Sequence, residues 1–265
     1  MSRLKTACTA FLSGLFFIGN QSDAQTVDEL ITDRPDITES AVTVTSHAIQ
    51  IESGFLFQRN MEEIDGADLK SETVSIPGIL LRYGVFPFLE LRAGTEYLFR
   101  EETSSGLTER INGINGILLG TKVQLLRDEQ TLPDAAVLLH FNLPLGNKNL
   151  KPEKVEPEII LALSHPVAGP FSISYNIGSV WQSPDEVINY FYSGSLAIEL
   201  AGKIGMFTEL FGSVSPKNSA SFNIDAGLAY LLHEDLQVDL SSGLFLRNPS
   251  DNWFIGTGIS FRIRH

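Results

Sequence analysis

Residues 222–230 read FNIDAGLAY, and in this stretch apolar residues alternate strictly with polar or small ones. In an extended strand, successive side chains point to opposite faces, so such alternation separates an apolar face from a polar one. The apolar face comprises Phe222, Ile224, Ala226, Leu228 and Tyr230. The other face carries Asn223 and Asp225, followed by Gly227 and Ala229. The stretch therefore predicts a β strand with one apolar and one wet surface.

The same period of two recurs along the chain from residue 47 onward. It defines twelve segments, near residues 47–58, 72–84, 88–100, 115–127, 134–144, 157–166, 170–182, 189–200, 203–214, 220–232, 235–246 and 252–264. Most of them reach the roughly 9 to 11 residues that a tilted strand needs to cross a bilayer, whereas strands of soluble proteins usually have about five or six. The chain is predicted to be all-β, with a single antiparallel transmembrane β-barrel of about twelve strands in up-and-down topology.

The links between these segments alternate in length. Long links are predicted at residues 59–71, 101–114 and 145–156, and each is followed by a shorter link such as 85–87. Outer-membrane barrels have short periplasmic turns and longer external loops, so this alternation indicates a barrel with both chain ends on the periplasmic side. A secreted β-sandwich is the alternative, because its strands also alternate.

One predicted strand is interrupted. In ETVSIPGILLRYG the apolar face changes from Val74 and Ile76 to Ile79, and Pro77 and Gly78 lie at the change. Proline cannot donate to a strand ladder, and glycine within a strand often marks a bulge. A β-bulge is therefore predicted there.

Aromatic residues gather near the predicted strand ends. The examples are Tyr83, Phe86, Phe88, Trp181, Tyr190, Tyr192, Trp253 and Phe254. Membrane barrels carry aromatic girdles at both interfaces, so these residues are predicted to face outward near the rims. Packing of the rings in a core is the competing interpretation.

The first residues carry the features of a secretory signal. MSRLK supplies a positive start, TACTAFLSGLFFIG a short apolar core, and a small-x-small site ends at Ala24. The apolar run is too short for a membrane anchor, which is the alternative. These features divide the chain into a signal peptide at 1–24, a polar N-terminal periplasmic segment (a latch or plug) at 25–45, and an outer-membrane β-barrel at 46–265.

Charge and cysteine content bound the partners. Removal of the signal takes two basic residues from 19 and one acidic residue from 32, which leaves 17 against 31, or a net charge of −14. Such a balance argues against nucleic acid as a partner. Cys8, the only cysteine, lies in the signal, so no disulfide is expected. The expected partners are outer-membrane lipid, a small-molecule solute and, during biogenesis, the barrel-assembly machinery; no cofactor is expected.

The stretch LITDRPDITESAVTV, residues 30–44, differs from everything that follows it. It places Asp33, Arg34, Pro35 and Asp36 in front of the first strand. A segment outside the barrel wall lies in the periplasm or folds back into the lumen, and both places are wet. Proline holds the preceding residue away from helix, which suits an extended latch. A disordered leader is the alternative.

The polar faces of the predicted strands supply the candidate lumen-lining residues. These are Glu52, Arg82, Glu90, Arg92, Glu96, Lys122, Glu209, Asp225, Asp239 and Arg262. Charges of both signs on the second and third strands predict a salt-bridge network that joins Arg82 to Glu90, Arg92 and Glu96. Such a network either fills a narrow barrel or lines a pore, and a twelve-stranded barrel lies between the filled and the open cases.

Motifs for catalysis are missing from the sequence. It contains no HExxH, P-loop or GxSxG motif, and the paired cysteines of a metal site are absent as well. The one arrangement with catalytic chemistry is His140 with a carboxylate such as Glu158, and a solvated lumen histidine is the simpler interpretation. No catalytic or metal-binding residue is predicted, and the protein is not expected to be an enzyme.

Several of these segments resemble a known family. They are ITDRPDITESAVTV, QIESGFLFQR, LLRYGVFPFLELRAGTEY, GTKVQLL, AAVLLHFNLPLG, FTELFG and the closing LQVDLSSGLFLRNPSDNWFIGTGISFRIR. Together they are similar to the bacterial outer-membrane family labelled "putative MetA-pathway of phenol degradation", whose members are commonly called transporters. The resemblance implies a single-chain β-barrel in the outer membrane.

Two functions are compatible with this barrel. The first is a passive, porin-like channel for small molecules, including hydrophobic or aromatic ones. The alternative is a non-conducting structural or surface-binding barrel that acts through its external loops. The sequence does not decide whether the lumen is open.

Overall fold

The computed structural model describes residues 30–64, 66–127, 132–184, 187–200, 202–216 and 220–264. Its strands are β1 (Ile49–Ile64), β2 (Ala67–Phe86), β3 (Leu89–Ser104), β4 (Leu107–Ile114), β5 (Ile117–Leu126), β6 (Asp134–Leu143), β7 (Glu156–Ala168), β8 (Phe171–Gln182), β9 (Val187–Leu200), β10 (Ile204–Val214), β11 (Asn223–His233), β12 (Leu236–Phe245) and β13 (Trp253–Ile263). Within these ranges there is no helix long and apolar enough to cross a membrane. The predicted signal peptide, residues 1–24, lies outside the described residues.

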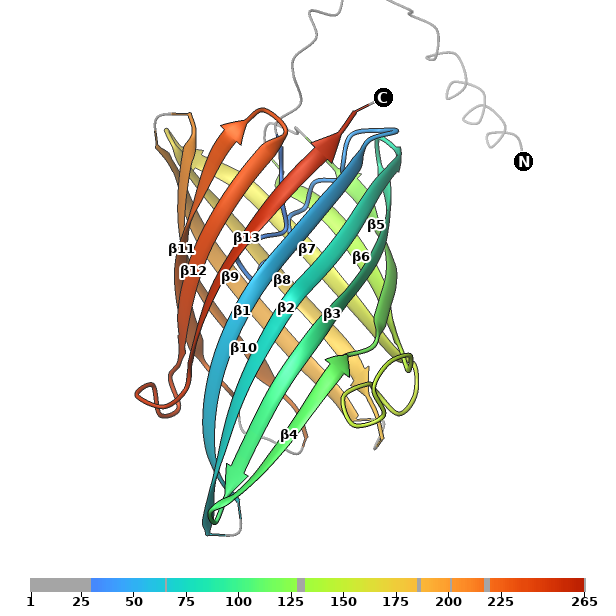
Figure 1. Ribbon diagram of the computed structural model, residues 1–265. Coiled ribbons are helices and arrows are strands. Elements are labelled where there is room, and N and C mark those ends of the chain that lie inside the picture. Colours follow the sequence, from blue (N-terminus) through green and yellow to red (C-terminus); the bar gives the residue numbers. More distant parts are fainter. Residues whose placement is uncertain are drawn as a thin grey trace, which may run out of the picture.

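The strands form one antiparallel sheet that closes on itself (Figure 1). Sequential strands are neighbours, and β1 pairs with β13 to complete the ring. The ring consists of β1 to β3 and β5 to β13, which makes twelve strands, while β4 pairs with the outer part of β3 as an extra strand. The prediction of a twelve-stranded barrel is confirmed, and the β-sandwich alternative is wrong.

The distribution of side chains is inverted relative to a soluble protein. Leu228 and Leu240 on the outer surface are 44% and 49% exposed, whereas Asp225 and Asp239 on the inner surface are 2% and 5% exposed. Apolar residues dominate the exposed wall, and the buried interior is rich in charged and polar groups. A closed barrel with an apolar outside and a polar inside is the architecture of an outer-membrane protein, because the wall faces lipid.

Both ends of the barrel sequence lie at one rim. Ile49, which begins β1, pairs with Ile263, which ends β13. The same rim carries the tight turns between β2 and β3, β7 and β8, and β11 and β12, while the connection from β6 to β7 is at the opposite rim (Figure 1). Outer-membrane barrels have short turns on the periplasmic side, so we refer to this rim as the periplasmic rim and to the opposite one as the external rim.

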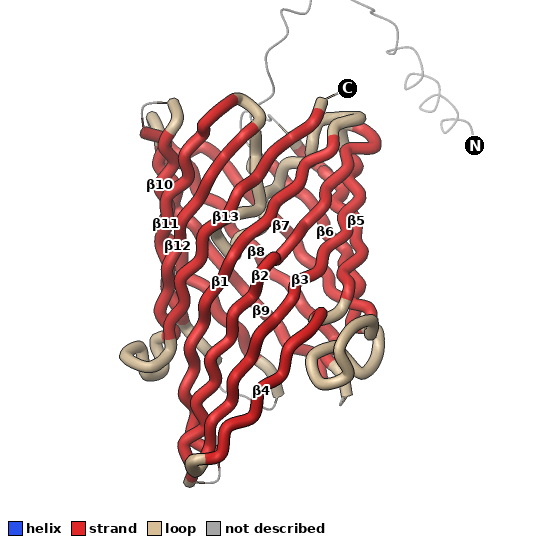
Figure 2. The backbone as a smooth tube through the Cα atoms, in the orientation of Figure 1, coloured by secondary structure: helices blue, strands red, loops and turns tan. Residues whose placement is uncertain are grey.

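Two of the predicted long loops are strand instead. Residues 59–64 extend β1 and residues 67–71 begin β2, while residues 101–104 extend β3 and residues 107–114 form β4. These extensions carry polar residues on both faces, so they lack the alternation that marks a strand in lipid. They project beyond the barrel (Figure 2), where both faces meet water, and cross-strand pairing satisfies the backbone.

The predicted β-bulge is confirmed. The pairing of β2 with β3 shifts between Ser75 and Gly78, and the pairing of β1 with β2 shifts between Gly54 and Leu56. An extra residue in one strand rotates the following side chains onto the opposite face. The shift therefore keeps Ile79 on the outer wall after Pro77.

The aromatic prediction holds at some positions and is wrong at one. Phe86, Phe88 and Tyr190 are exposed on the outer surface near strand ends. Phe254 is buried inside the barrel, where its ring lies 5.9 Å from that of Phe245. Phe254 occupies the same strand face as the inward-facing Gly and Ser residues of β13, so the period of two places it inside.

Candidate functional site

Residues 30–48, here called the N-terminal segment, lie inside the barrel (Figure 2). Their polar contacts reach side chains of β1, β2, β3, β5, β8, β9, β10 and β12. Strands on opposite sides of a closed ring can be reached together only from the lumen. The segment occupies the part of the lumen next to the periplasmic rim (Figure 1).

One contact of the segment is basic, and we call it the basic anchor. The carboxylate of Asp33 lies 3.0 Å from Arg82, 3.1 Å from Arg92 and 3.0 Å from Lys122. These three cations come from β2, β3 and β5, and their side chains are buried. Burial alone would raise the pKa of Asp33, but Arg82, Lys122 and Arg92 together hold that pKa well below its usual range.

Further ion pairs balance the charge of the basic anchor. Arg82 also binds Glu52 at 2.9 Å and Glu90 at 2.7 Å, and Arg92 binds Glu39 at 2.9 Å. The predicted pairing of Arg82 with Glu90 is thus present. Buried charges need partners on every side to offset their desolvation, and this network supplies them.

The second contact of the segment is acidic, and we call it the acidic contact. Glu209 of β10 and Asp225 of β11 are directly opposite each other in the strand pairing. The amide of Ile37 donates to Glu209 at 2.8 Å, and the hydroxyl of Thr38 donates to the other oxygen of Glu209. Within the described chain neither carboxylate forms an ion pair, and both oxygens of Asp225 are buried without a hydrogen-bond partner. Burial and the charge of Glu209 raise the pKa of Asp36 well above its usual range.

Arg34 links the segment to a third part of the wall. Its guanidinium donates to both oxygens of Asp239 on β12, at 2.9 and 3.2 Å. The guanidinium lies against Gly54 and Gly258, and a Cβ atom at either position would overlap it. Glycine on these two inner faces is what lets Arg34 cross the lumen to reach Asp239.

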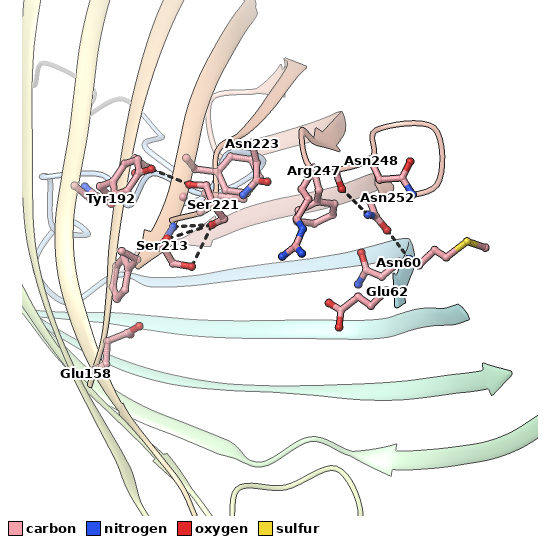
Figure 3. A pocket seen from close by; sticks show the side chains of 18 of the residues that line it. Asn60, Glu62, Glu158, Tyr192, Ser213, Ser221, Asn223, Arg247, Asn248 and Asn252 are labelled. Carbon is pink, nitrogen blue, oxygen red and sulfur yellow. Dashed lines mark hydrogen bonds between the residues drawn. The ribbon is translucent and has the colours of Figure 1, made fainter. Parts of the chain in front are cut away.

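Beyond the segment, toward the external rim, the lumen opens into two cavities that we call the vestibule. The larger cavity has a volume of about 1020 Å³ and the smaller about 440 Å³, and both are lined by Glu39 and Glu158. Three phenylalanines, Phe191, Phe211 and Phe245, line the larger cavity. Figure 3 shows its polar side, which includes Asn60, Arg247, Asn223 and Asn252.

His140 and Glu158 both line the smaller cavity, and Glu158 also lines the larger one. The Nδ1 atom of His140 lies 2.7 Å from a carboxylate oxygen of Glu158. The ring is buried, and its Nε2 atom has no hydrogen-bond partner among the described residues. The pair therefore contributes to the lining one carboxylate that borders both cavities and one buried ring that holds this carboxylate in place.

The structure places the sequence-predicted residues at three kinds of position. The residues that are buried in the barrel interior are Glu52, Arg82, Glu90, Arg92, Lys122, Glu209, Asp225, Asp239 and Arg262. Glu96 is half-buried and lines the smaller cavity, where it accepts bonds from Ser75 and Asn115 instead of joining the Arg82 network. Arg262 binds Asp235 at the periplasmic rim. Most of these residues therefore hold the N-terminal segment or the wall, and few border open space.

Several residues of the vestibule were missed by sequence reasoning. The period of two places Phe191, Phe211 and Phe245 on the inward strand faces, next to polar residues. Their hydropathy alone would place them against lipid. Glu39 lies within the polar stretch that was singled out, yet its pairing with Arg92 joins residues 53 positions apart and depends on barrel closure.

The chain has an outer-membrane β-barrel fold, and comparisons with known proteins refine this class. The family profile described as "Putative MetA-pathway of phenol degradation" matches residues 32–263, and the chain belongs to this family. No curated protein sequence matches the chain.

Solved structures show the same fold at low identity. An outer membrane channel from Pseudomonas putida F1 is 11% identical, with a TM-score of 0.64 over 84% of this chain and 98% of that one. The translocator domain of the autotransporter NalP from Neisseria meningitidis is 7% identical, with a TM-score of 0.56 over 84% and 91%. KdgM porin is 10% identical, with a TM-score of 0.52 over 82% and 99%.

Proposed function

We propose that the protein is a passive outer-membrane channel for small molecules, and that its N-terminal segment sets whether it conducts. The observation that carries this proposal is the vestibule, whose larger cavity has a volume of about 1020 Å³, inside a closed barrel with a polar interior. Twelve strands give a lumen wider than that of the filled eight-stranded barrels. The Pseudomonas putida barrel, which shares the fold, is described as an outer membrane channel.

The N-terminal segment is the barrier in this proposal, and acts as a plug. It crosses the lumen from the Asp33 anchor to the Thr38 contact, and its side chains bind strands on both sides. These contacts are noncovalent and polar, so water can replace them when the segment moves. Ala41 adds apolar packing against Ala136, Leu138 and Ile160 of the wall. Conduction requires this displacement, while the barrel wall stays closed.

The vestibule also bears on the solutes. Its phenylalanine side chains suit apolar and aromatic bodies, and the asparagines of the same lining offer hydrogen bonds to polar groups. Outer-membrane lipid surrounds the wall, and the barrel-assembly machinery is the partner during insertion. No catalytic role is part of the proposal, and the pairing of His140 with Glu158 is assigned to the lining of the lumen.

The second candidate, a non-conducting barrel, is favoured by the basic anchor. Three buried cations on Asp33 make displacement of the segment costly, and a segment that never leaves would seal the barrel. Current through purified, refolded protein in planar bilayers separates the two candidates. Stepwise currents in the wild type or in Asp33→Asn support the channel, and their lasting absence in both supports the sealed barrel.

A further inference from the structure

The vestibule carries an excess of negative charge. Seven carboxylates line its two cavities: Glu39, Glu52, Glu62, Glu63, Glu96, Glu156 and Glu158. Three guanidiniums line the same cavities: Arg34, Arg92 and Arg247. Two of these three are already bound to carboxylates, because Arg34 binds Asp239 and Arg92 binds Glu39. Glu52 and Glu39 are likewise bound to arginines, which leaves five carboxylates against Arg247, so the net charge that lines the vestibule is acidic.

Two of these carboxylates are held in place by uncharged groups. Glu96 accepts from the Ser75 hydroxyl at 2.7 Å, and Glu156 accepts from the amide and hydroxyl of Ser183 at 2.7 and 2.8 Å. Neutral partners fix the positions of the carboxylates and leave their negative charge uncompensated. Fixed carboxylates around a pore lumen attract cations and repel anions.

His140 adds an independent feature in the lining of the smaller cavity. When its Nδ1–H donates to Glu158, the Nε2 atom becomes a hydrogen-bond acceptor, and this buried atom has no partner among the described residues. The carboxylate oxygens and the ring nitrogen that line this cavity are all groups that accept N–H bonds. An ammonium group has three such donors and no acceptor.

The aromatic wall extends the chemistry of the site beyond a bare ion. Phe191, Phe211 and Phe245 line the cavity that also contains Glu39 and Glu158. Phenylalanine faces attract cations and also pack against apolar bodies. A ligand that fits both features has one positive charge and a small apolar or aromatic body.

We propose that the vestibule selects small organic cations, in particular primary ammonium compounds with an apolar or aromatic body, over anions of the same size. This proposal rests on the proposed channel function and names its substrate class. Glu158 and His140 receive the ammonium group, and the phenylalanine wall receives the body.

The test uses three solutes of one size and shape: benzylammonium, benzyl alcohol and benzoate. Reversal potentials of the full mature protein in planar bilayers give the permeability of benzylammonium relative to K⁺ and of benzoate relative to Cl⁻. Entry of benzyl alcohol is followed by swelling of proteoliposomes. We expect benzylammonium to permeate several-fold better than benzoate, with the alcohol between them.

Matched variants locate the effect. Glu158→Gln should lower the preference for benzylammonium several-fold, and Glu158→Asp should retain most of it, because it keeps the charge. Glu109→Gln removes a carboxylate from the exposed strand β4, away from the cavities, and should leave the preference unchanged. Heat-modified migration in detergent gels confirms that each variant has folded.

The outcomes separate this proposal from the proposed function. A current that favours benzoate, or equal permeability of the two ions in the wild type, overturns the cation preference and leaves the channel intact. An equal loss of preference in Glu109→Gln and Glu158→Gln would assign the effect to net charge and overturn the vestibule as its source. Absence of current in every variant overturns the channel, and the cation preference with it.

Discussion

The N-terminal segment meets the barrel wall in two places of opposite character. At the basic anchor, Asp33 lies among Arg82, Arg92 and Lys122, so charge complementarity holds it. At the acidic contact, only a few residues further on, the segment meets Glu209, and Asp36 adds another carboxyl group. The segment is therefore attached unequally. The basic anchor resists release, while the acidic contact is weakened by like charges and depends on protonation of its carboxyl groups.

The largest effect is expected at the basic anchor. Asp33→Asn removes the one carboxylate that three buried cations share, and breaking a buried ion pair typically costs about 3–5 kcal/mol. The segment should then leave the lumen far more often. Single-channel recording should show a large rise in the open fraction relative to wild type.

A matched change at the acidic contact serves as its control. Asp36→Asn removes a carboxyl group from the same segment without removing an ion pair, and should not raise the open fraction. An equal rise of the open fraction in Asp33→Asn and Asp36→Asn would show that the basic anchor does not hold the segment more firmly than the acidic contact.

A substitution on the lipid face of β11 tests the barrel wall independently of the acidic contact. Leu228 and Asp225 lie on opposite faces of this strand, and Leu228→Arg puts a charge into hydrocarbon. The barrel should lose about 2–4 kcal/mol of stability if the position is near the midplane. Refolding into lipid vesicles under a denaturant series measures this loss. A harmless Leu228→Arg together with a severe Asp225→Asn would mean that the wall is inside out.

The acidic contact predicts a dependence on pH. Seating of the segment raises the pKa of Asp36, so the contribution of Asp36 to seating is complete below the ordinary aspartate pKa of about 4 and is lost as pH rises above it. The lowered pKa of Asp33 acts in the opposite direction, and only below that value. The carboxyl groups that act on Asp36 are Glu209, Asp225 and Asp33, and the neighbouring cation, Arg34, is bound to Asp239. The open fraction should therefore increase with pH.

Removing one of those carboxylates should flatten the pH dependence. Asp225→Asn deletes a charge directly opposite Glu209, and like charges in that position cost up to about 1 kcal/mol. The variant should open less than wild type at high pH and match it at low pH. A pH profile of the open fraction identical to that of wild type would show that the acidic contact does not control opening.

The smallest effect is expected at Asp239. Asp239→Asn keeps a hydrogen-bond acceptor for Arg34 but removes the charge, and Arg34 is partly exposed. The loss of seating free energy should stay below about 1 kcal/mol. The open fractions of Asp239→Asn and Asp33→Asn are compared at one pH. We expect the smaller rise in Asp239→Asn. An Asp239→Asn effect as large as that of Asp33→Asn would make Arg34 the main anchor.

The barrel was predictable because a wall that faces lipid on one side and water on the other requires apolar and polar residues to alternate along each strand. Alternation in segments such as FNIDAGLAY gives the strand, its length and its two faces, and the change of face at Pro77 and Gly78 gives the bulge. Strand β4 escaped prediction because it lies beyond the membrane. There, both faces of a strand can be polar, and the alternation disappears.

The candidate site was predictable only in part. Arg82 and Glu90 pair across the tight β2–β3 turn, eight residues apart, which a reading of neighbouring strands can find. The contact of Asp33 with Lys122 joins residues 89 positions apart, and Thr38 meets Ser193 across 155 positions. Such contacts follow from closure of the ring around the segment, and a local pattern does not encode them.

We infer that displacement of the N-terminal segment opens the channel, and a reversible disulfide between the segment and the wall tests this inference. The hydroxyl oxygens of Thr38 and Ser193 lie 2.7 Å apart, and the one native cysteine is Cys8 in the predicted signal peptide. Thr38→Cys combined with Ser193→Cys therefore places two thiols where a disulfide can form, since its S–S bond is about 2.05 Å long. We expect no current from the oxidised protein and a return of current on reduction, with each single variant insensitive to oxidation. Equal currents before and after reduction of a fully formed disulfide would show that opening does not require displacement of the segment.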